Sequence, residues 1–334
     1  NTGVGFCALR NNTEGDSNTG FGRGALQTNA TGDDNTAVGR NALISSTTAS
    51  DNTAVGSCAL TTNTTGDFNT AVGYDALYSN TTADRNTAVG MSALLSTTTG
   101  CCNTSIGQGT MSANSTGDNN VAVGVLALTA NTTADNNTAV GYHSLLQNTT
   151  GNSNTAVGQC TLETNVSGVS NVAVGLQALR QNTASDNVAI GTLALLVNQD
   201  GTKNVAVGKS SLSSNTTADN NTAIGWESLC SNTTGTLNTA VGALALEDNT
   251  IGCQNTSVGG TSLRNNTEGN FNAAFGRDSM NVNTTGDNNT AIGTCALVYN
   301  QTADNNTAVG FKSLFCNTTG ASNVAIGYQT MLKN

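Results

Sequence analysis

Few side chains in this sequence suit acid–base catalysis or metal binding, and they lie far apart along the chain. The 334 residues include one histidine, His143, and nine cysteines. A catalytic centre requires several unlike groups that converge on one place, and the sequence specifies no partner for His143. We therefore predict that His143 is an exposed substitution, that the chain is not an enzyme, and that it carries no cofactor or metal.

The cysteines follow neither the spacing of a zinc site nor that of a compact disulfide framework. Cys101 and Cys102 are adjacent in the sequence. Four others share one position of the repeat described below, at least three repeats apart, too far for a disulfide if the repeats stack. These four are Cys7, Cys58, Cys160 and Cys295. Two pairs on neighbouring repeats leave a disulfide open, namely Cys230 with Cys253 and Cys295 with Cys316.

Aspartates also share a repeat position, where a column of carboxylates would attract Ca²⁺. They include Asp33, Asp67, Asp118, Asp219, Asp287 and Asp304. Other residue types interrupt this column, and the G-G-x-G-x-D motif of calcium-binding repeats is absent. We interpret these aspartates as turn formers.

A third chemical signal is the Asn-x-Ser/Thr sequon of N-glycosylation, which recurs in a predicted turn. On a glycosylating secretory route this edge would carry a row of sugars; otherwise the motif is turn chemistry. The candidate acceptors are Asn29, Asn63, Asn80, Asn114, Asn131, Asn148, Asn165, Asn215, Asn232, Asn283, Asn300 and Asn317.

All of these residues belong to one tandem repeat that fills the chain. From Asn1 the sequence divides into 20 repeats with the consensus N-T-A-V-G-x-x-A-L-x-x-N-T-T-G-D-N. Most repeats have 17 residues; the one at 171–186 has 16, and the last is cut at 12. We expect one continuous repeat domain over residues 1–334, taken from a longer polypeptide.

The repeat favours short strands and turns over helices. It has many Asn, Thr and Gly residues, which are poor helix formers, and the chain has no proline. In the repeat that begins at Asn69, we predict a strand over 69–73, a glycine corner, a second strand over 75–79 and an Asn/Thr turn. Two short strands per coil indicate an all-β fold, a parallel β-solenoid of about 20 coils.

Stacked coils place equal repeat positions above one another. Position 1 should therefore form a ladder of asparagine amides, which begins with Asn1, Asn18, Asn35, Asn52, Asn69 and Asn86. Position 5 should form glycine corners, which begin with Gly5, Gly22, Gly39, Gly56, Gly73 and Gly90. Positions 4 and 9 should form apolar core columns, represented by Val38, Val55, Val72, Leu43, Leu60 and Leu77.

Small residues at positions 3 and 8 suggest a surface for self-association. Neighbouring residues of a strand point to opposite faces, so Ala71 and Ala76 should point outward if Val72 and Leu77 point inward. Outward stripes of small side chains would allow two or three identical chains to pack closely. The alternative is that alanine is merely neutral on a thin surface.

The net charge of −10 is spread thinly and includes no basic cluster, which argues against nucleic acid as a partner. No apolar run approaches the ~18 residues of a membrane span. We predict no membrane insertion in this segment.

The strand segments N-V-A-V-G at Asn120 and N-V-A-I-G at Asn187 and Asn323 resemble those of YadA-type trimeric autotransporter adhesin heads. Similar N-T-A-V-G repeats occur in fibre proteins that end in an endosialidase-type intramolecular chaperone. The resemblance covers the whole chain and implies a left-handed parallel β-roll that forms a homotrimer. The 17-residue period and the N-T-T-G-D turn depart from the adhesin-head pattern.

Two classes of function follow. The first is structural: an extracellular or cell-surface shaft of a fibre, filament or adhesin, which contacts other copies or a host surface through positions 6, 7, 10 and 11. The second is a regular-array binder, such as an ice-binding solenoid that uses ranks of threonine at positions 2, 13 and 14.

Overall fold

The computed structural model describes residues 1–333, and within them the secondary structure consists of 20 strands of three residues each. Each strand covers positions 2 to 4 of one repeat. The strands are β1 Thr2–Val4, β2 Thr19–Phe21, β3 Thr36–Val38, β4 Thr53–Val55, β5 Thr70–Val72, β6 Thr87–Val89, β7 Thr104–Ile106, β8 Val121–Val123, β9 Thr138–Val140, β10 Thr155–Val157, β11 Val172–Val174, β12 Val188–Ile190, β13 Val205–Val207, β14 Thr222–Ile224, β15 Thr239–Val241, β16 Thr256–Val258, β17 Ala273–Phe275, β18 Thr290–Ile292, β19 Thr307–Val309 and β20 Val324–Ile326.

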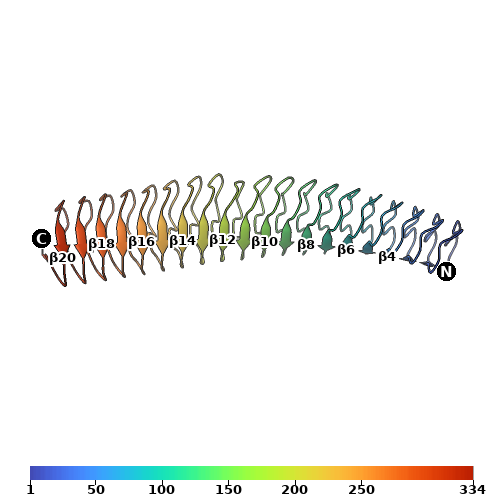
Figure 1. Ribbon diagram of the computed structural model, residues 1–334, viewed down its shortest axis with the longest axis horizontal. Helices are drawn as coiled ribbons and strands as arrows, with labels where there is room; N and C mark the ends of the chain where they lie inside the picture. Colours follow the sequence, from blue (N-terminus) through green and yellow to red (C-terminus); the bar gives the residue numbers. More distant parts are fainter. Residues whose placement is uncertain (334) are drawn as a thin grey trace. The chain divides into compact units, whose positions relative to one another are not determined.

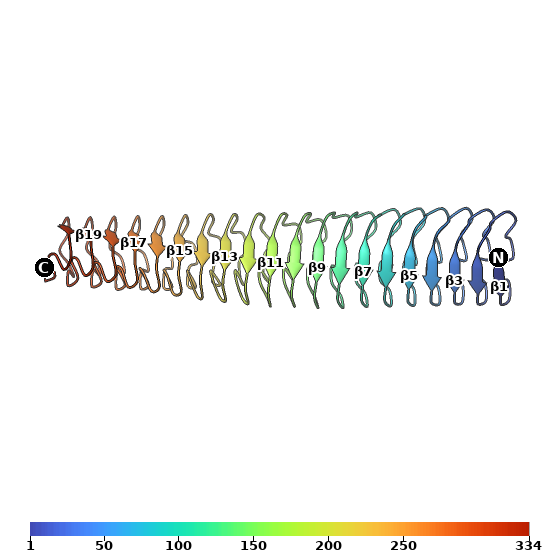
Figure 2. The same ribbon diagram turned by 60° about the horizontal axis from the view of Figure 1, so that its bottom comes forward.

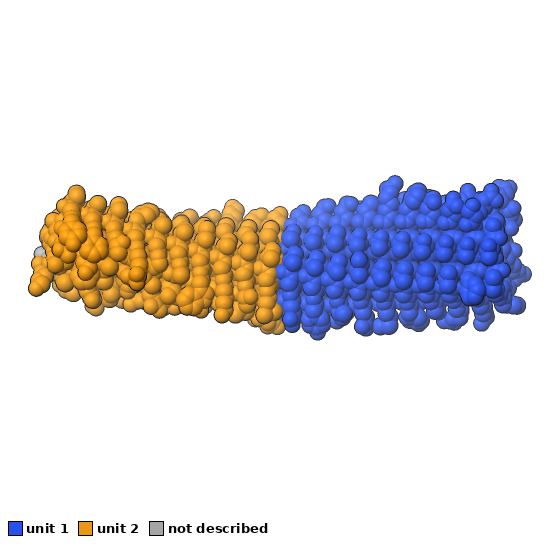
Figure 3. Space-filling view, turned by 90° about the horizontal axis from the view of Figure 1, so that it is seen from below, with its two compact units in different colours: residues 1–169 blue, residues 170–334 orange. Residues whose placement is uncertain are grey.

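The chain divides into two compact units, each a stack of coils (Figure 3). Unit 1 covers Asn1–Val169 and contains β1 to β10; unit 2 covers Ser170–Asn334 and contains β11 to β20. Within each unit, successive strands lie side by side (Figures 1 and 2) and pair in parallel, with equal repeat positions opposite one another, as in Ala54 with Ala71. The predicted parallel β-solenoid is confirmed.

A glycine corner ends each strand because the next coil leaves no space for a side chain. Gly73 has a φ of +142°, and a Cβ atom placed there would lie 2.5 Å from the carbonyl oxygen of Gly90 in the next coil. Left-handed backbone of this kind is open to glycine and costly for other residues. The predicted corners at position 5 are confirmed.

The predicted second strand is wrong, because positions 6 to 11 form turns. In the fourth coil, Ala59 N–H donates to Gly56 O over 3.5 Å and Asn63 N–H donates to Leu60 O over 3.3 Å. The leucine or methionine at position 9 has a φ between 46° and 52° in every coil. An L-residue adopts this left-handed conformation at a cost, so each turn depends on the packing of the side chain that it directs inward.

The interior holds Ala and Leu, whereas Val faces outward. Ala71, Ala76 and Leu77 are fully buried, while Val72 is half-buried. The predicted leucine column is therefore confirmed, and the predicted valine column of Val38, Val55 and Val72 is wrong.

The width of the coil explains why alanine rather than valine occupies its interior. In the first coil, a Cβ atom on Gly3 would lie 3.5 Å from Leu9 Cδ1, already in van der Waals contact. Position 3 also faces position 8, since Ser105 Oγ lies 2.5 Å from Thr110 Oγ1 within one coil. The space between positions 3, 8 and 9 admits small side chains (Gly, Ala, Ser or Thr) and buries them, so the outward stripes that we predicted for Ala71 and Ala76 do not exist.

The 16-residue coil of unit 2 keeps its strand and shortens its turn. Val172 pairs with Val188, one residue short of the usual spacing, and the strand register continues through Val205. Asn182 Nδ2 donates to Ala184 O, two residues on, whereas the equivalent amide of Asn198 donates to Gly201 O, three residues on. The missing residue therefore lies in the turn after position 12.

Candidate functional site

The outward face of the sheet is an uncharged strip formed by positions 2 and 4. Position 2 is Thr, Val or Ala and position 4 is Val, Ile or Phe in all 20 repeats. Several position-4 side chains are well exposed, among them Phe21 at 56%, Ile106 at 41% and Val55 at 36%. We call the side chains at positions 2 and 4 the sheet face.

The asparagine ladder at position 1 exists, and its coils are joined mainly by bonds from a backbone N–H to an amide oxygen, with amide-to-amide bonds in some coils, as from Asn52 Nδ2 to Asn35 Oδ1 over 3.2 Å. Asn86 N–H donates to Asn69 Oδ1 over 3.0 Å, while Asn69 Nδ2 donates to Ala83 O of its own coil over 2.8 Å. The side chain thus links the backbone of the next coil to the turn of its own. Asn18 to Asn86 of the predicted set are buried, and Asn1, in the first coil, is exposed.

A second asparagine column, at position 12, also bonds amide to amide and includes all of the predicted sequons. Asn80 Nδ2 donates to Asn63 Oδ1 over 2.8 Å and to Ala83 O over 3.1 Å. All twelve candidate acceptors are fully buried. A glycan would replace one of these bonded hydrogens and would have no room, so the glycosylation prediction is incompatible with this fold.

The position-16 aspartates hydrogen-bond across coils. Asp84 Oδ1 accepts the backbone N–H of Asp67 over 2.8 Å, and Asp67 Oδ1 accepts that of Ser50 over 2.8 Å. Asn152 and Asn270 do the same with an amide oxygen, at 2.8 Å each. The role of this column is therefore to pair the turns of adjacent coils, which a neutral side chain performs equally well.

None of the nine cysteines, all of which lie within residues 1–333, forms a disulfide. A hydrogen bond with the Cys102 side chain, together with burial and the charge of Asp118, raises the pKa of the Cys101 thiol to about 11. This thiol stays protonated at neutral pH and is a poor nucleophile.

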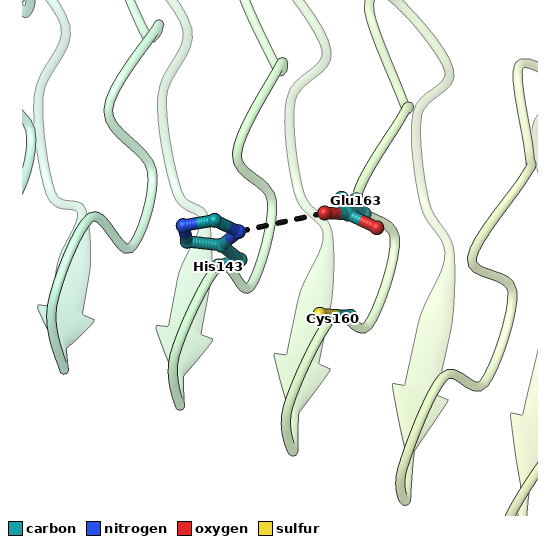
Figure 4. Close-up of side chains that lie close together, drawn as sticks. All are labelled: His143, Cys160 and Glu163. Atoms are coloured by element: carbon teal, nitrogen blue, oxygen red, sulfur yellow. Dashed lines mark ion pairs between the residues drawn. The ribbon is translucent and has the colours of Figure 1, made fainter.

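One cluster of metal-ligand side chains forms within the described residues, at His143, Cys160 and Glu163 of unit 1 (Figure 4). His143 Nδ1 lies 3.5 Å from Glu163 Oε1, and the ligand atoms of all three residues lie within 4.8 Å of one another. Cys160 is 8% exposed, and the side chains of His143 and Glu163 are 21% and 14% exposed. His143 is therefore half-buried beside two other ligand-type side chains, and the prediction that it is an exposed substitution is wrong.

Backbone bonds on both sides of the cluster fix its three residues. Cys160 N–H donates to Tyr142 O over 2.9 Å, and Gln147 N–H donates to Glu163 O over 3.1 Å. The ring of Tyr142 stacks on the His143 imidazole with 3.8 Å between centroids. The two neighbouring coils thus hold in register the backbone that carries the three side chains.

The signal for this cluster is present in the sequence. Cys160 follows His143 by one repeat length, and both occupy position 7, while Glu163 occupies position 10 of the same repeat as Cys160. Stacking brings position 7 of one coil beside that of the next. Comparing only the cysteines of neighbouring repeats overlooks this set. Comparing every titratable residue with the residues one repeat away from it reveals the set.

Within residues 1–333 there is no helix, and so none long and apolar enough to cross a membrane. Comparison of the sequence with protein-family models finds no match, and comparison with curated proteins finds none either.

Proposed function

We propose that this protein is a structural shaft of an extracellular fibre, filament or adhesin, in which identical chains associate side by side through the sheet face. The supporting observation is that each unit repeats one hydrogen-bonded coil without interruption. The described residues contain no pocket in which a small substrate would bind. Added coils extend such a stack without a new folding problem.

The sheet face supports self-association because it lacks charge on an otherwise acidic chain. None of the 21 acidic or 11 basic residues stands at position 2 or 4. Exposed apolar rows of this regularity mark an interaction surface. A second copy of the chain is the favoured partner because its coils repeat at the same spacing. Each row of sheet-face side chains on one copy can then pack against an equivalent row on the other. The resemblance to YadA-type heads makes three the expected number of chains.

The exposed aromatic side chains at position 6 are the surface that we propose for contact with other fibres or a host. Phe6, Tyr74 and Trp226 are 75%, 53% and 48% exposed. They lie outside the sheet face and vary between repeats, so they change the surface without changing the coil.

Analytical ultracentrifugation tests the self-association. We expect the wild-type chain to sediment as an oligomer, with the width of more than one coil stack in electron micrographs. Lysine at three adjacent sheet-face positions (Val55→Lys, Val72→Lys and Val89→Lys together) should dissociate it and leave the circular dichroism unchanged. Lysine at Thr65, which is exposed on another edge, is the matched control. A monomeric wild type, or an oligomer that survives the triple substitution, would contradict the proposal.

The alternative is an ice-binding solenoid, and the outward threonines of the sheet face are the observation that favours it. Seven consecutive coils, from Thr2 to Thr104, carry threonine at position 2. The position-13 threonines are excluded from this role where their hydroxyls donate to the next coil, as Thr64 Oγ1 does to Thr81 O over 3.0 Å. Thermal hysteresis that disappears on substitution of Thr53, Thr70 and Thr87 by lysine would replace the shaft proposal.

A further inference from the structure

From the geometry of His143, Cys160 and Glu163 we propose a transition-metal site, specific for Zn²⁺ or a similar ion, that joins two neighbouring coils of unit 1. The ligand atoms come from a thiol, an imidazole and a carboxylate that all lie within 4.8 Å of one another. This mixed sulfur, nitrogen and oxygen set suits zinc. The site is independent of the proposed shaft function.

The distances are close to those that a bound ion needs. Tetrahedral zinc with bonds of about 2.0–2.2 Å to nitrogen and oxygen places those two atoms about 3.3 Å apart. His143 Nδ1 and Glu163 Oε1 are 3.5 Å apart. This separation exceeds that of a normal hydrogen bond and is about 0.2 Å longer than that of the zinc-bound pair.

The balance of charge also fits. A thiolate and a carboxylate neutralise a divalent cation, and the imidazole binds as a neutral ligand. Because the His143 and Glu163 side chains are partly exposed, the fourth coordination position would open to solvent. His143 comes from one coil, and Cys160 and Glu163 come from the next. The ion would therefore bind the folded stack in preference to the unfolded chain and stabilise the junction.

Metal titration of the tag-free chain tests the site. We expect one Zn²⁺ per chain by calorimetry, and a thiolate-to-cobalt charge-transfer band when Co²⁺ replaces it. Cys160→Ser should abolish the band. His143→Gln and Glu163→Gln should weaken binding by more than the ~10–100-fold that outer-shell partners typically contribute. Multiple weak binding without a charge-transfer band, or a Cys160→Ser variant that binds like the wild type, would overturn the proposal.

The repeat supplies a matched control and a site for transplantation at Cys58. Cys58 and Cys160 share position 7 and nearly the same φ, 61° and 54°. Asn41 and Thr61 stand where the site has His143 and Glu163. Cys58→Ser should leave metal binding unchanged. The double substitution Asn41→His with Thr61→Glu should raise the stoichiometry from one to two; a stoichiometry that stays at one would contradict the claim that these repeat positions create the site.

Discussion

The position-1 asparagines carry a testable share of the stability, and Asn69→Ala measures it. This substitution removes two buried hydrogen bonds at once. Asn86 N–H loses its acceptor at 3.0 Å, and Ala83 O loses its donor at 2.8 Å. Asn69 is fully buried, so water cannot replace either partner while the coils remain stacked.

The expected cost follows from the two orphaned groups. Leaving one buried donor or acceptor unsatisfied costs about 1–3 kcal/mol. Two such groups therefore cost about 2–6 kcal/mol, and the loss should be local because each coil contacts its neighbours. Since about 1.4 kcal/mol corresponds to tenfold in an equilibrium constant, opening of this part of the stack should become about 30-fold to 10⁴-fold more frequent.

Hydrogen exchange at the adjacent strands reports this opening directly. The amides of Thr70 and Thr87 each donate to an asparagine carbonyl of the next coil over 2.8 Å, and their exchange should accelerate by the factor above. Thr65→Ala, at an exposed position, should change stability by less than about 0.5 kcal/mol. If exchange in Asn69→Ala matches that in Thr65→Ala, the asparagine ladder does not stabilise the stack.

Three further substitutions test the corner, the core and the second asparagine column. Gly73→Ala should lower the free energy of unfolding by more than the ~1–3 kcal/mol of a strained conformation, because its Cβ atom would also clash with the backbone of the next coil. Gly260→Ala should be tolerated, because a Cβ atom there would have nothing within 4 Å. Thermal unfolding measures both effects. Leu77→Ala should cost about 3–5 kcal/mol in denaturant unfolding, whereas the half-buried Val72→Ala should cost less than about 1 kcal/mol; equal costs would contradict the observed burial. Thr97→Asn should raise the free energy of unfolding by about 1 kcal/mol, and with it the melting temperature, because its amide would donate to Asn80 Oδ1 of the preceding coil, which has no partner.

The repeat period alone was enough to predict the stack, the leucine column and the glycine corners. Equal positions lie above one another in any stack of equal coils, so their identity follows from the consensus. The direction in which each side chain points does not follow from the consensus. The alternation predicted for Ala71 and Val72 is present but has the opposite phase. The phase depends on how much volume the coil encloses, and this coil encloses little beyond alanine, leucine and the two asparagine columns.

The predicted second strand failed for a conformational reason. A leucine in left-handed backbone is uncommon, so the sequence alone predicts extended backbone for the segment that contains Leu77. The actual φ of 48° turns the chain and brings Ala76 and Leu77 to the same interior. The same error placed the Asn-x-Thr motif on an exposed turn, whereas Asn80 closes that interior from the other side.

The two asparagine columns have a consequence for where function can arise in this fold. Outside the two end coils these asparagines are buried and bond the backbone of the turns, so positions 1 and 12 are not accessible to a ligand. The side chains at the variable positions 6, 7, 10 and 11 are not required to bond the turns in this way, and a substitution there leaves the coil intact. Any site must therefore combine residues about one repeat apart, as His143 and Cys160 do. A solenoid of this kind acquires a site by matching two adjacent coils, and it can lose that site by a single substitution without any change in its backbone.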